Sequence, residues 1–255
     1  MPVSTASVVT AIRVLESLSE LQPVGLSALA RQLNASKATV LRMLSTLSEL
    51  GWVTQSSGVE ASWSMTFHAY AVVARNGTVS SLREIALGPM NGLQLDTTET
   101  IHLAVPDGQE LVVIERLDTS HVLRAFLALG TRVPMHASGT GLAFLAASED
   151  SFITDYLSRP LENISGRSIT TEAALWVEIN QIRERGYSIN EEGLSTGITS
   201  VGAAVIGGNS KLPIACVSIS GPSNRITSDK FEEYGRAVAS AAQEIGRQAS
   251  TSRLG

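Results

Sequence analysis

Four stretches of this 255-residue sequence carry side chains whose types and spacing suit catalysis or binding. The first, Gly193-Leu194-Ser195-Thr196-Gly197, matches the G-x-S-x-G pattern in which hydrolases present a nucleophilic serine. Such a serine needs a strand before it, a helix after it and a histidine later in the chain. The last histidine is His136, and the stretch leads into a strand-like segment. A serine hydrolase that uses Ser195 is therefore only an alternative interpretation.

The second stretch, Ser138-Gly139-Thr140-Gly141, lies where a predicted loop enters a helix over Thr140–Ala147. Backbone amides in the first turn of a helix have no partner inside the helix, and they attract anions. The same residues also suit a plain capped helix in which the glycines allow close packing. The sequence leaves both interpretations open.

The third stretch, Ser218-Ile219-Ser220, places two hydroxyls on one face of an otherwise apolar strand. This follows because residues two apart in a strand point the same way. Buried hydroxyls need hydrogen-bond partners. Those partners are either backbone carbonyls or oxygens of a bound ligand.

The fourth stretch, from Ser27 to Leu50, has the pattern of a helix-turn-helix. Ser27 is expected to cap a helix over Ala28–Leu33, and Ser36 is expected to cap a second helix that ends before Gly51. In the second helix the apolar side chains share one face, and they are Val40, Met43, Leu44 and Leu47. A plain helical hairpin would show the same apolar pattern.

The outward face of the second helix is small, polar and basic, as a DNA-reading helix requires. The candidates for DNA contact are Ser36, Lys37, Ala38, Thr39, Leu41 and Arg42. Arg42 suits guanine and Leu41 a thymine methyl group, whereas the three hydroxyl- or amine-bearing residues at 36, 37 and 39 suit phosphate. Residues 31–42 hold three basic residues and no acidic one, which favours DNA.

Elements on either side of this stretch complete a winged domain. A helix carrying Val8, Ile12 and Leu15 precedes it, and a hairpin of 52–55 and 59–65 follows it as the wing. We assign residues 1–65 to a winged helix-turn-helix domain, 66–77 to a linker helix and 78–255 to a second domain.

The second domain alternates between strand and helix patterns. Strands are predicted at 100–105, 110–116, 122–129, 187–190, 200–206 and 214–220, and helices at 79–95, 140–147, 148–157, 171–185 and 227–247. This order predicts an α+β fold with an antiparallel sheet faced by helices.

Composition excludes several classes of protein. The net charge is −5, yet residues 1–65 hold four basic and four acidic residues, so the acidity belongs to the second domain. A DNA-binding domain with no net charge binds DNA weakly as a single copy. We therefore expect a homodimer or homotetramer. A single cysteine and four scattered histidines predict no disulfide, metal site or cofactor. No signal peptide or membrane span is evident, so we expect a cytoplasmic protein.

These motifs together resemble the IclR family of bacterial transcriptional regulators. The resemblance rests on six segments, which are GLSALARQLNASKATVLRMLSTLSELGWV at 25–53, SLREIA at 81–86, TIHLAV at 100–105, RVPMHASGTGLAFLA at 132–146, IRERGYSINEEGLSTG at 182–197 and VSISGPSNRIT at 217–227. It implies a DNA-binding repressor or activator of a catabolic operon, with a GAF/PAS-like effector-binding domain. Its effector would be a small organic acid, such as a hydroxybenzoate or a short 2-oxoacid. The resemblance implies no catalytic residues.

The resemblance also implies the effector-binding residues, which are Gly139, Thr140, Asn190, Ile198, Ser200, Ser218 and Ser220. Two of them depart from the family, which often has aspartate at the position of Asn190 and cysteine at that of Ser200. An asparagine removes a negative charge and both donates and accepts hydrogen bonds, which favours an anion. Leu41 stands where the family often has a polar or aromatic residue, so the operator sequence does not carry over.

Overall fold

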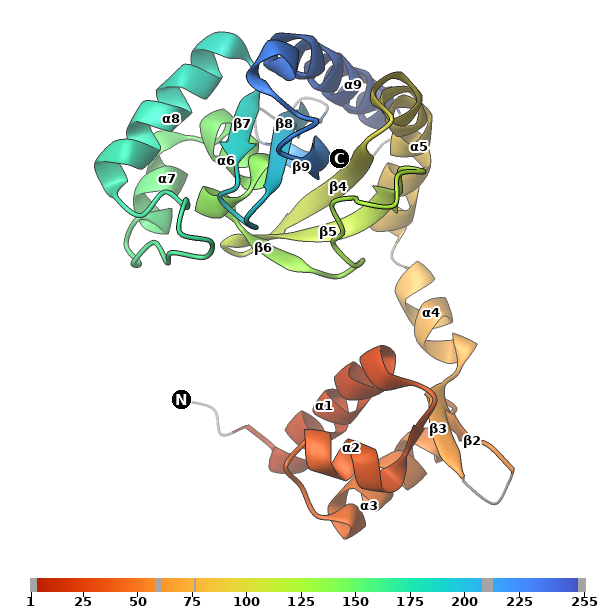
Figure 1. Cartoon of the computed structure of the whole chain (residues 1–255). Coiled ribbons are helices and arrows are strands. Elements are labelled where there is room, and N and C mark those ends of the chain that lie inside the picture. Colours follow the sequence, from red (N-terminus) through yellow and green to blue (C-terminus); the bar gives the residue numbers. More distant parts are fainter. Residues whose placement is uncertain (1–3, 58–60, 76, 208–212, 252–255) are drawn as a thin grey trace. The chain divides into compact units, whose positions relative to one another are not determined.

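The computed structural model describes residues 4–57, 61–75, 77–207 and 213–251. It divides into two compact units, Met1–Gly77 and Thr78–Gly255, and each is described by itself (Figure 1). None of the helices in the described ranges is long and apolar enough to cross a membrane.

The first unit is a three-helix core with a small sheet and a following helix. Its elements are α1 (Ala6–Leu21), β1 (Val24–Gly25), α2 (Leu26–Gln32), α3 (Lys37–Glu49), β2 (Val53–Gln55), β3 (Ser62–Met65) and α4 (Phe67–Ala74). The strands are antiparallel in the order β1-β3-β2. Buried apolar residues from α1, α2 and α3 pack with Trp63 of the sheet.

Two details of this unit differ from the sequence prediction. Helix α2 begins at Leu26 after Gly25, not after Ser27, because Val24 and Gly25 pair with β3 and deliver the chain directly into the helix. The predicted second wing strand began at residue 59, and residues 58–60 lie outside the described ranges. The described strand begins at Ser62.

The second unit is built on a six-stranded antiparallel sheet. Its strands are β4 (Thr100–Asp107), β5 (Glu110–Leu117), β6 (Arg132–Pro134), β7 (Ser188–Glu191), β8 (Ile198–Ile206) and β9 (Pro213–Pro222), in the order β6-β5-β4-β9-β8-β7. The predicted winged helix-turn-helix and α+β fold class is confirmed.

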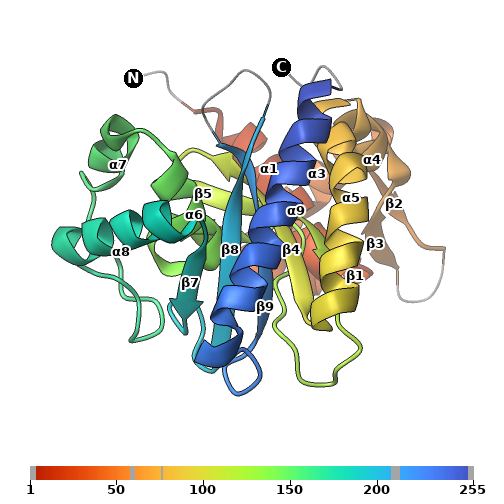
Figure 2. The ribbon, with the colours of Figure 1, turned by 90° about the horizontal axis from the view of Figure 1, so that it is seen from above.

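Helices cover both faces of this sheet. One layer holds α5 (Gly77–Thr97) and α9 (Phe231–Thr251), and the other holds α6 (Gly139–Ala147), α7 (Asp150–Tyr156) and α8 (Glu172–Arg185). Figure 2 shows α5 and α9 side by side, with α6, α7 and α8 toward the opposite side of the sheet. Alternation along β4 serves both layers, since Ile101 and Leu103 face α5 and α9 while Ala104 faces α6.

Two predictions for this unit are wrong, one of a strand and one of the residue at which a helix starts. Residues 122–129 do not form a strand, because the edge of β5 pairs with Arg132–Pro134 instead and the segment leaves Val122 and Leu123 exposed. The helix predicted at 148–157 starts later than predicted, because the Ser148 hydroxyl donates to the Phe144 carbonyl at 2.8 Å at the end of α6. Helix α7 begins at Asp150 after Glu149.

Candidate functional site

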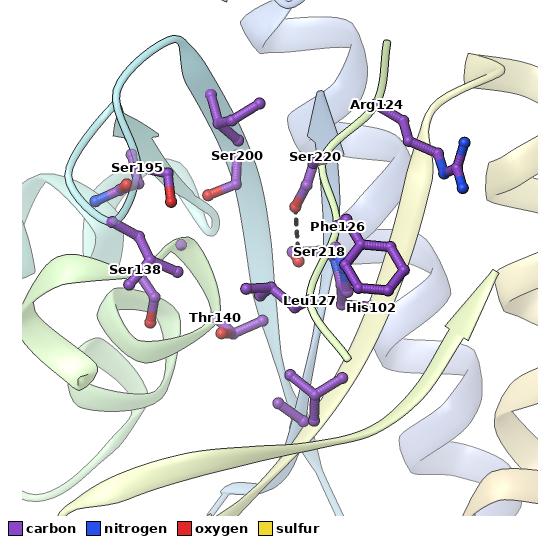
Figure 3. Close-up of a pocket in the computed structure, with 17 residues that line it drawn as sticks. His102, Arg124, Phe126, Leu127, Ser138, Thr140, Ser195, Ser200, Ser218 and Ser220 are labelled. Atoms are coloured by element: carbon purple, nitrogen blue, oxygen red, sulfur yellow. Dashed lines mark hydrogen bonds between the residues drawn. The ribbon is translucent and has the colours of Figure 1, made fainter. Parts of the chain in front are cut away.

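A cavity of about 270 Å³ lies between the sheet and the start of α6. All seven residues predicted for effector binding line it, and they are Gly139, Thr140, Asn190, Ile198, Ser200, Ser218 and Ser220. Figure 3 shows their labelled members facing one another across the cavity. These side chains come from β8, β9, the end of β7 and the first turn of α6, which are far apart in sequence.

Strand register places the polar side chains of the floor side by side. Ser200 of β8 pairs with Ser220 of β9, and Asn190 of β7 pairs with Ser200 on its other side. In the next row Ser218 of β9 pairs with His102 of β4. Residues directly opposite in antiparallel strands project to the same face, with Cβ atoms about 5 Å apart. The floor is therefore two adjacent rows of polar groups.

The first turn of α6 forms the opposite wall. Ser138 caps the helix, since its hydroxyl accepts from the Gly141 amide at 3.1 Å and donates to the Pro134 carbonyl at 2.9 Å. The backbone amides of Gly139 and Thr140 have no carbonyl to bind within the helix, because they belong to its first turn. They are therefore available as hydrogen-bond donors beside the cavity, which both residues line. A Cβ added to Gly139 would lie 2.5 Å from Ser200 Oγ, so a side chain at this position would displace the Ser200 hydroxyl.

The two serines of β9 share a hydrogen bond, with their hydroxyl oxygens 3.4 Å apart (Figure 3). Both are almost completely buried, with 3% of Ser218 and 5% of Ser220 exposed. Each hydroxyl has capacity beyond this one long bond, since a hydroxyl donates once and accepts twice. The pair can therefore bind a ligand oxygen, which was one of the two interpretations of the sequence.

His102 is the cavity residue that the sequence interpretation missed. Its side chain is 2% exposed, and neither ring nitrogen has a hydrogen-bond partner among the described residues. Burial, and secondarily the positive charge of Arg116, lowers the pKa of His102 from 6.5 to about 4. The imidazole is therefore neutral at pH 7. Alternation along Thr100–Val105 shows which face of the strand His102 is on, but it does not show that this face lines a cavity.

A segment between β5 and β6 covers the His102 side of the cavity. Arg124, Ala125, Phe126 and Leu127 line the cavity from this segment. Arg116 holds it, donating to the Leu127 carbonyl at 2.7 Å and lying 4.0 Å from the Phe126 ring centre. Arg124 points away from the serines and lies 3.7 Å from Asp118 (Figure 3). This wall is apolar except for the edge that Arg124 forms.

Ser195 also lines the cavity but is not placed as a nucleophile. It lies in the loop between β7 and β8, so the motif joins a strand to a strand, whereas a nucleophile elbow joins a strand to a helix. His136 is used elsewhere, with Nδ1 2.6 Å from the Tyr156 hydroxyl and Nε2 2.9 Å from the Glu162 carbonyl. Within the described residues, no three metal-binding side chains gather.

Helix α3 presents the predicted DNA-contacting face. Ser36 caps it by accepting from the Thr39 amide at 3.1 Å, and the predicted apolar side is buried against α1 and α2. The opposite side is exposed at Ser36, Lys37, Ala38, Leu41 and Arg42, with Thr39 half-buried. Leu41 is 43% exposed, which is unusual for a leucine next to a core. Of the ion pairs in the described ranges, none involves Lys37 or Arg42.

Comparison with known proteins identifies the same two parts. Residues 7–57 match the IclR helix-turn-helix domain, and residues 77–247 match the C-terminal domain of IclR bacterial transcriptional regulators. The transcriptional repressor IclR of Escherichia coli is 32% identical over 243 residues, covering 94% of this chain and 88% of the repressor.

Two solved structures share the fold across both parts. The Thermotoga maritima IclR structure has a TM-score of 0.80 and 26% identity, covering 96% of this chain and 98% of that one. An IclR homolog from Microbacterium hydrocarbonoxydans, complexed with 4-hydroxybenzoate, has a TM-score of 0.83 and 21% identity, covering 97% and 100%. The matched family and the Escherichia coli relative are transcriptional regulators, not enzymes, so the hydrolase alternative is set aside.

Proposed function

The chain belongs to the IclR family of bacterial transcriptional regulators, and we propose that it is a repressor of a catabolic operon that a small carboxylic acid controls. The observation that carries the ligand control is the cavity of the second unit, which all seven expected positions line. A regulator of this kind acts on chromosomal DNA in the cytoplasm. The ligand would shift the population between two arrangements of the DNA-binding domains by binding one more tightly.

The cavity favours a compact anion with an apolar body. Its carboxylate would accept from the amides of Gly139 and Thr140 and from the hydroxyls of Ser218 and Ser220. Ala104, Val113, Phe126 and Leu127 line the other side with apolar groups, which suit an aromatic ring or a short chain. The volume of about 270 Å³ is at the lower limit for small-molecule sites. A hydroxybenzoate is supported by the bound ligand of the Microbacterium homolog, and a short 2-oxoacid is the second class.

The operator would be read by α3 in the major groove. Arg42 would bind a guanine edge, and Leu41 would contact a thymine methyl group. Ser36, Lys37 and Thr39, at the start of the helix, would bind phosphates, and Ala38 completes the proposed DNA-contacting set. We assign residues 1–65 to DNA binding, 66–77 to the linker helix and 78–255 to effector binding.

A second copy of the chain would supply the rest of the DNA affinity. The first unit is not basic overall, and it exposes large apolar side chains on α1 and α4. Val8 is 59%, Ile12 50%, Phe67 91% and Tyr70 70% exposed. Burying such side chains between copies is favourable, at about 25 cal/mol per Å². A homodimer, or a tetramer made of two dimers, on a palindromic operator follows from this.

A gel shift with the DNA directly upstream of the chain's own gene tests specific DNA binding by α3. The wild type should form a specific complex, and Arg42→Ala should abolish it while Arg159→Ala, an exposed arginine of the second unit, should not. An unchanged shift with Arg42→Ala would remove the recognition-helix claim. A wild type that binds ligand but no DNA would instead favour a sensor without DNA binding.

The cavity claim is tested by calorimetry with 4-hydroxybenzoate and with pyruvate. Ser218→Ala combined with Ser220→Ala should weaken binding about tenfold or more, because a charged acceptor loses two donors. Ser151→Ala, an exposed serine on α7, is the control. Equal affinity in the double variant would overturn the cavity assignment.

A further inference from the structure

We propose that His102 selects the effector by hydrogen-bonding an uncharged hydroxyl that the ligand carries at the end remote from its carboxylate. This inference rests on the proposed function, and it chooses between the two ligand classes. A 4-hydroxylated aromatic acid fits, whereas a 2-oxoacid, whose oxo group is next to its carboxylate, does not.

The imidazole of His102 has unused hydrogen-bonding capacity. It is 2% exposed, lines the cavity, and has no partner for either ring nitrogen among the described residues. Buried polar groups nearly always have partners, so an orphaned one needs a specific explanation. Thr100 Oγ1, two residues away on β4, also lacks a partner among the described residues, but Thr100 does not line the cavity, whereas Ser218 and Ser220 bind each other. Because His102 lines the cavity, we infer that its missing hydrogen-bond partner is a polar group of the bound ligand.

Strand order sets the distance between His102 and the anion-binding turn. Gly139 lies over β8, because a Cβ on Gly202 of that strand would be 2.8 Å from the Gly139 carbonyl oxygen. His102 is on β4, and β9 separates β4 from β8. Neighbouring strands are about 4.8 Å apart, so His102 lies roughly 10 Å across the sheet from that turn, with Ser218 of β9 between them. A ligand that reaches both needs a ring or chain between its two polar groups.

The surroundings of His102 favour a neutral group over a second carboxylate. Two cations lie on this side, Arg116, which pairs with His102 in the strand register, and Arg124, which lines the cavity 3.7 Å from Asp118. The Arg116 guanidinium already binds Asp118 at 2.9 Å and the Leu127 carbonyl. Apolar Phe126 and Leu127 close this side. A neutral imidazole offers one donor and one acceptor, and a hydroxyl matches either of them.

The test measures the affinity of the full-length chain for four probes by calorimetry, namely 4-hydroxybenzoate, benzoate, terephthalate and pyruvate. The wild type should bind 4-hydroxybenzoate about tenfold or more tightly than each of the others, because benzoate leaves the imidazole unpaired. His102→Phe should remove this preference, lowering 4-hydroxybenzoate affinity while leaving benzoate affinity within about twofold. His102→Gln keeps a donor and an acceptor, and it should retain most of the preference.

Controls separate this inference from the function on which it rests. His121→Phe, an exposed histidine outside the cavity, should bind like the wild type, and thermal melts should show both His102 variants folded. The inference is overturned if benzoate, terephthalate or pyruvate binds as tightly as 4-hydroxybenzoate, if His102→Phe keeps the preference, or if none of the four binds. If pyruvate binds best and the Ser218→Ala, Ser220→Ala variant loses it, His102 selection fails while the proposed cavity stands.

Discussion

The side chain of Ser188 donates a hydrogen bond to the main-chain carbonyl of Gly139 at 2.6 Å, and this joins β7 to the first turn of α6. The contact turns the helix start toward the polar rows of the sheet. It is possible because Gly202 has no side chain where α6 crosses β8. The anion-binding end of the cavity therefore depends on close backbone packing as well as on the groups that would touch a ligand.

Gly202→Ala should weaken effector binding. The added Cβ would lie 2.8 Å from the Gly139 carbonyl oxygen and would push α6 away from the sheet. Overpacking of this kind costs about 1–3 kcal/mol, so we expect about a tenfold loss of affinity by calorimetry. Gly92→Ala, at a helical glycine with open space around it, is the matched control and should bind normally. Full affinity in Gly202→Ala would show that the approach of α6 is not needed.

Arg225→Ala should lower the free energy of unfolding by about 3 kcal/mol. Arg225 binds both carboxylate oxygens of Glu99, at 2.6 and 2.7 Å, and it also donates to the Leu123 carbonyl. Glu99 is 2% exposed, so losing its partner leaves a buried charge unpaired. Arg247→Ala breaks an exposed pair on α9 and should change stability little. Urea unfolding measures both, and equal effects would contradict the prediction.

His102 should make the second unit less stable in acid. The unfolded chain takes up a proton near pH 6.5, while the folded chain resists until about pH 4. The contribution of His102 to the free energy of unfolding is therefore complete above pH 6.5 and is lost as the pH falls toward 4. At pH 4 the free energy of unfolding is lower by about 3 kcal/mol. His102→Gln should flatten this part of the stability profile, measured by urea unfolding at pH 7, 6, 5 and 4.5. His121→Gln should keep the wild-type slope, and a parallel profile for His102→Gln would disprove the assignment.

Local signals in the sequence predicted most helix limits. Ser36 caps α3 as predicted, and Ser138 and Thr171 cap α6 and α8 close to the predicted starts of those helices, while Gly186 ends α8 in a left-handed conformation. These signals work because a cap needs only neighbours three residues away. Ser27 failed because the strand pairing of Val24, a contact with residue 63, determines where α2 starts.

The missing cavity residues depend on long-range contacts that no local pattern contains. His102 looked like any residue of a strand, and its orphaned nitrogens follow from a register with Ser218, which is distant in sequence. The segment at 122–129 has a strand-like composition, yet Arg116 binds its backbone at Leu127 and holds it over the cavity. In contrast, the two β9 serines were identifiable, because alternation within one strand is local.

Substitutions on α3 should separate base reading from phosphate binding. Leu41 is 43% exposed and is not part of the core cluster of the first unit, so Leu41→Ala should leave thermal stability nearly unchanged while lowering affinity for the operator by about 1–3 kcal/mol. Affinity for unrelated DNA should not change. Lys37→Ala should instead weaken binding to both DNAs alike and reduce the slope of log affinity against log salt by about one per reading helix. Fluorescence anisotropy with both DNAs at several salt concentrations measures this. If Leu41→Ala weakens operator and unrelated DNA equally, Leu41 is not a base-reading residue.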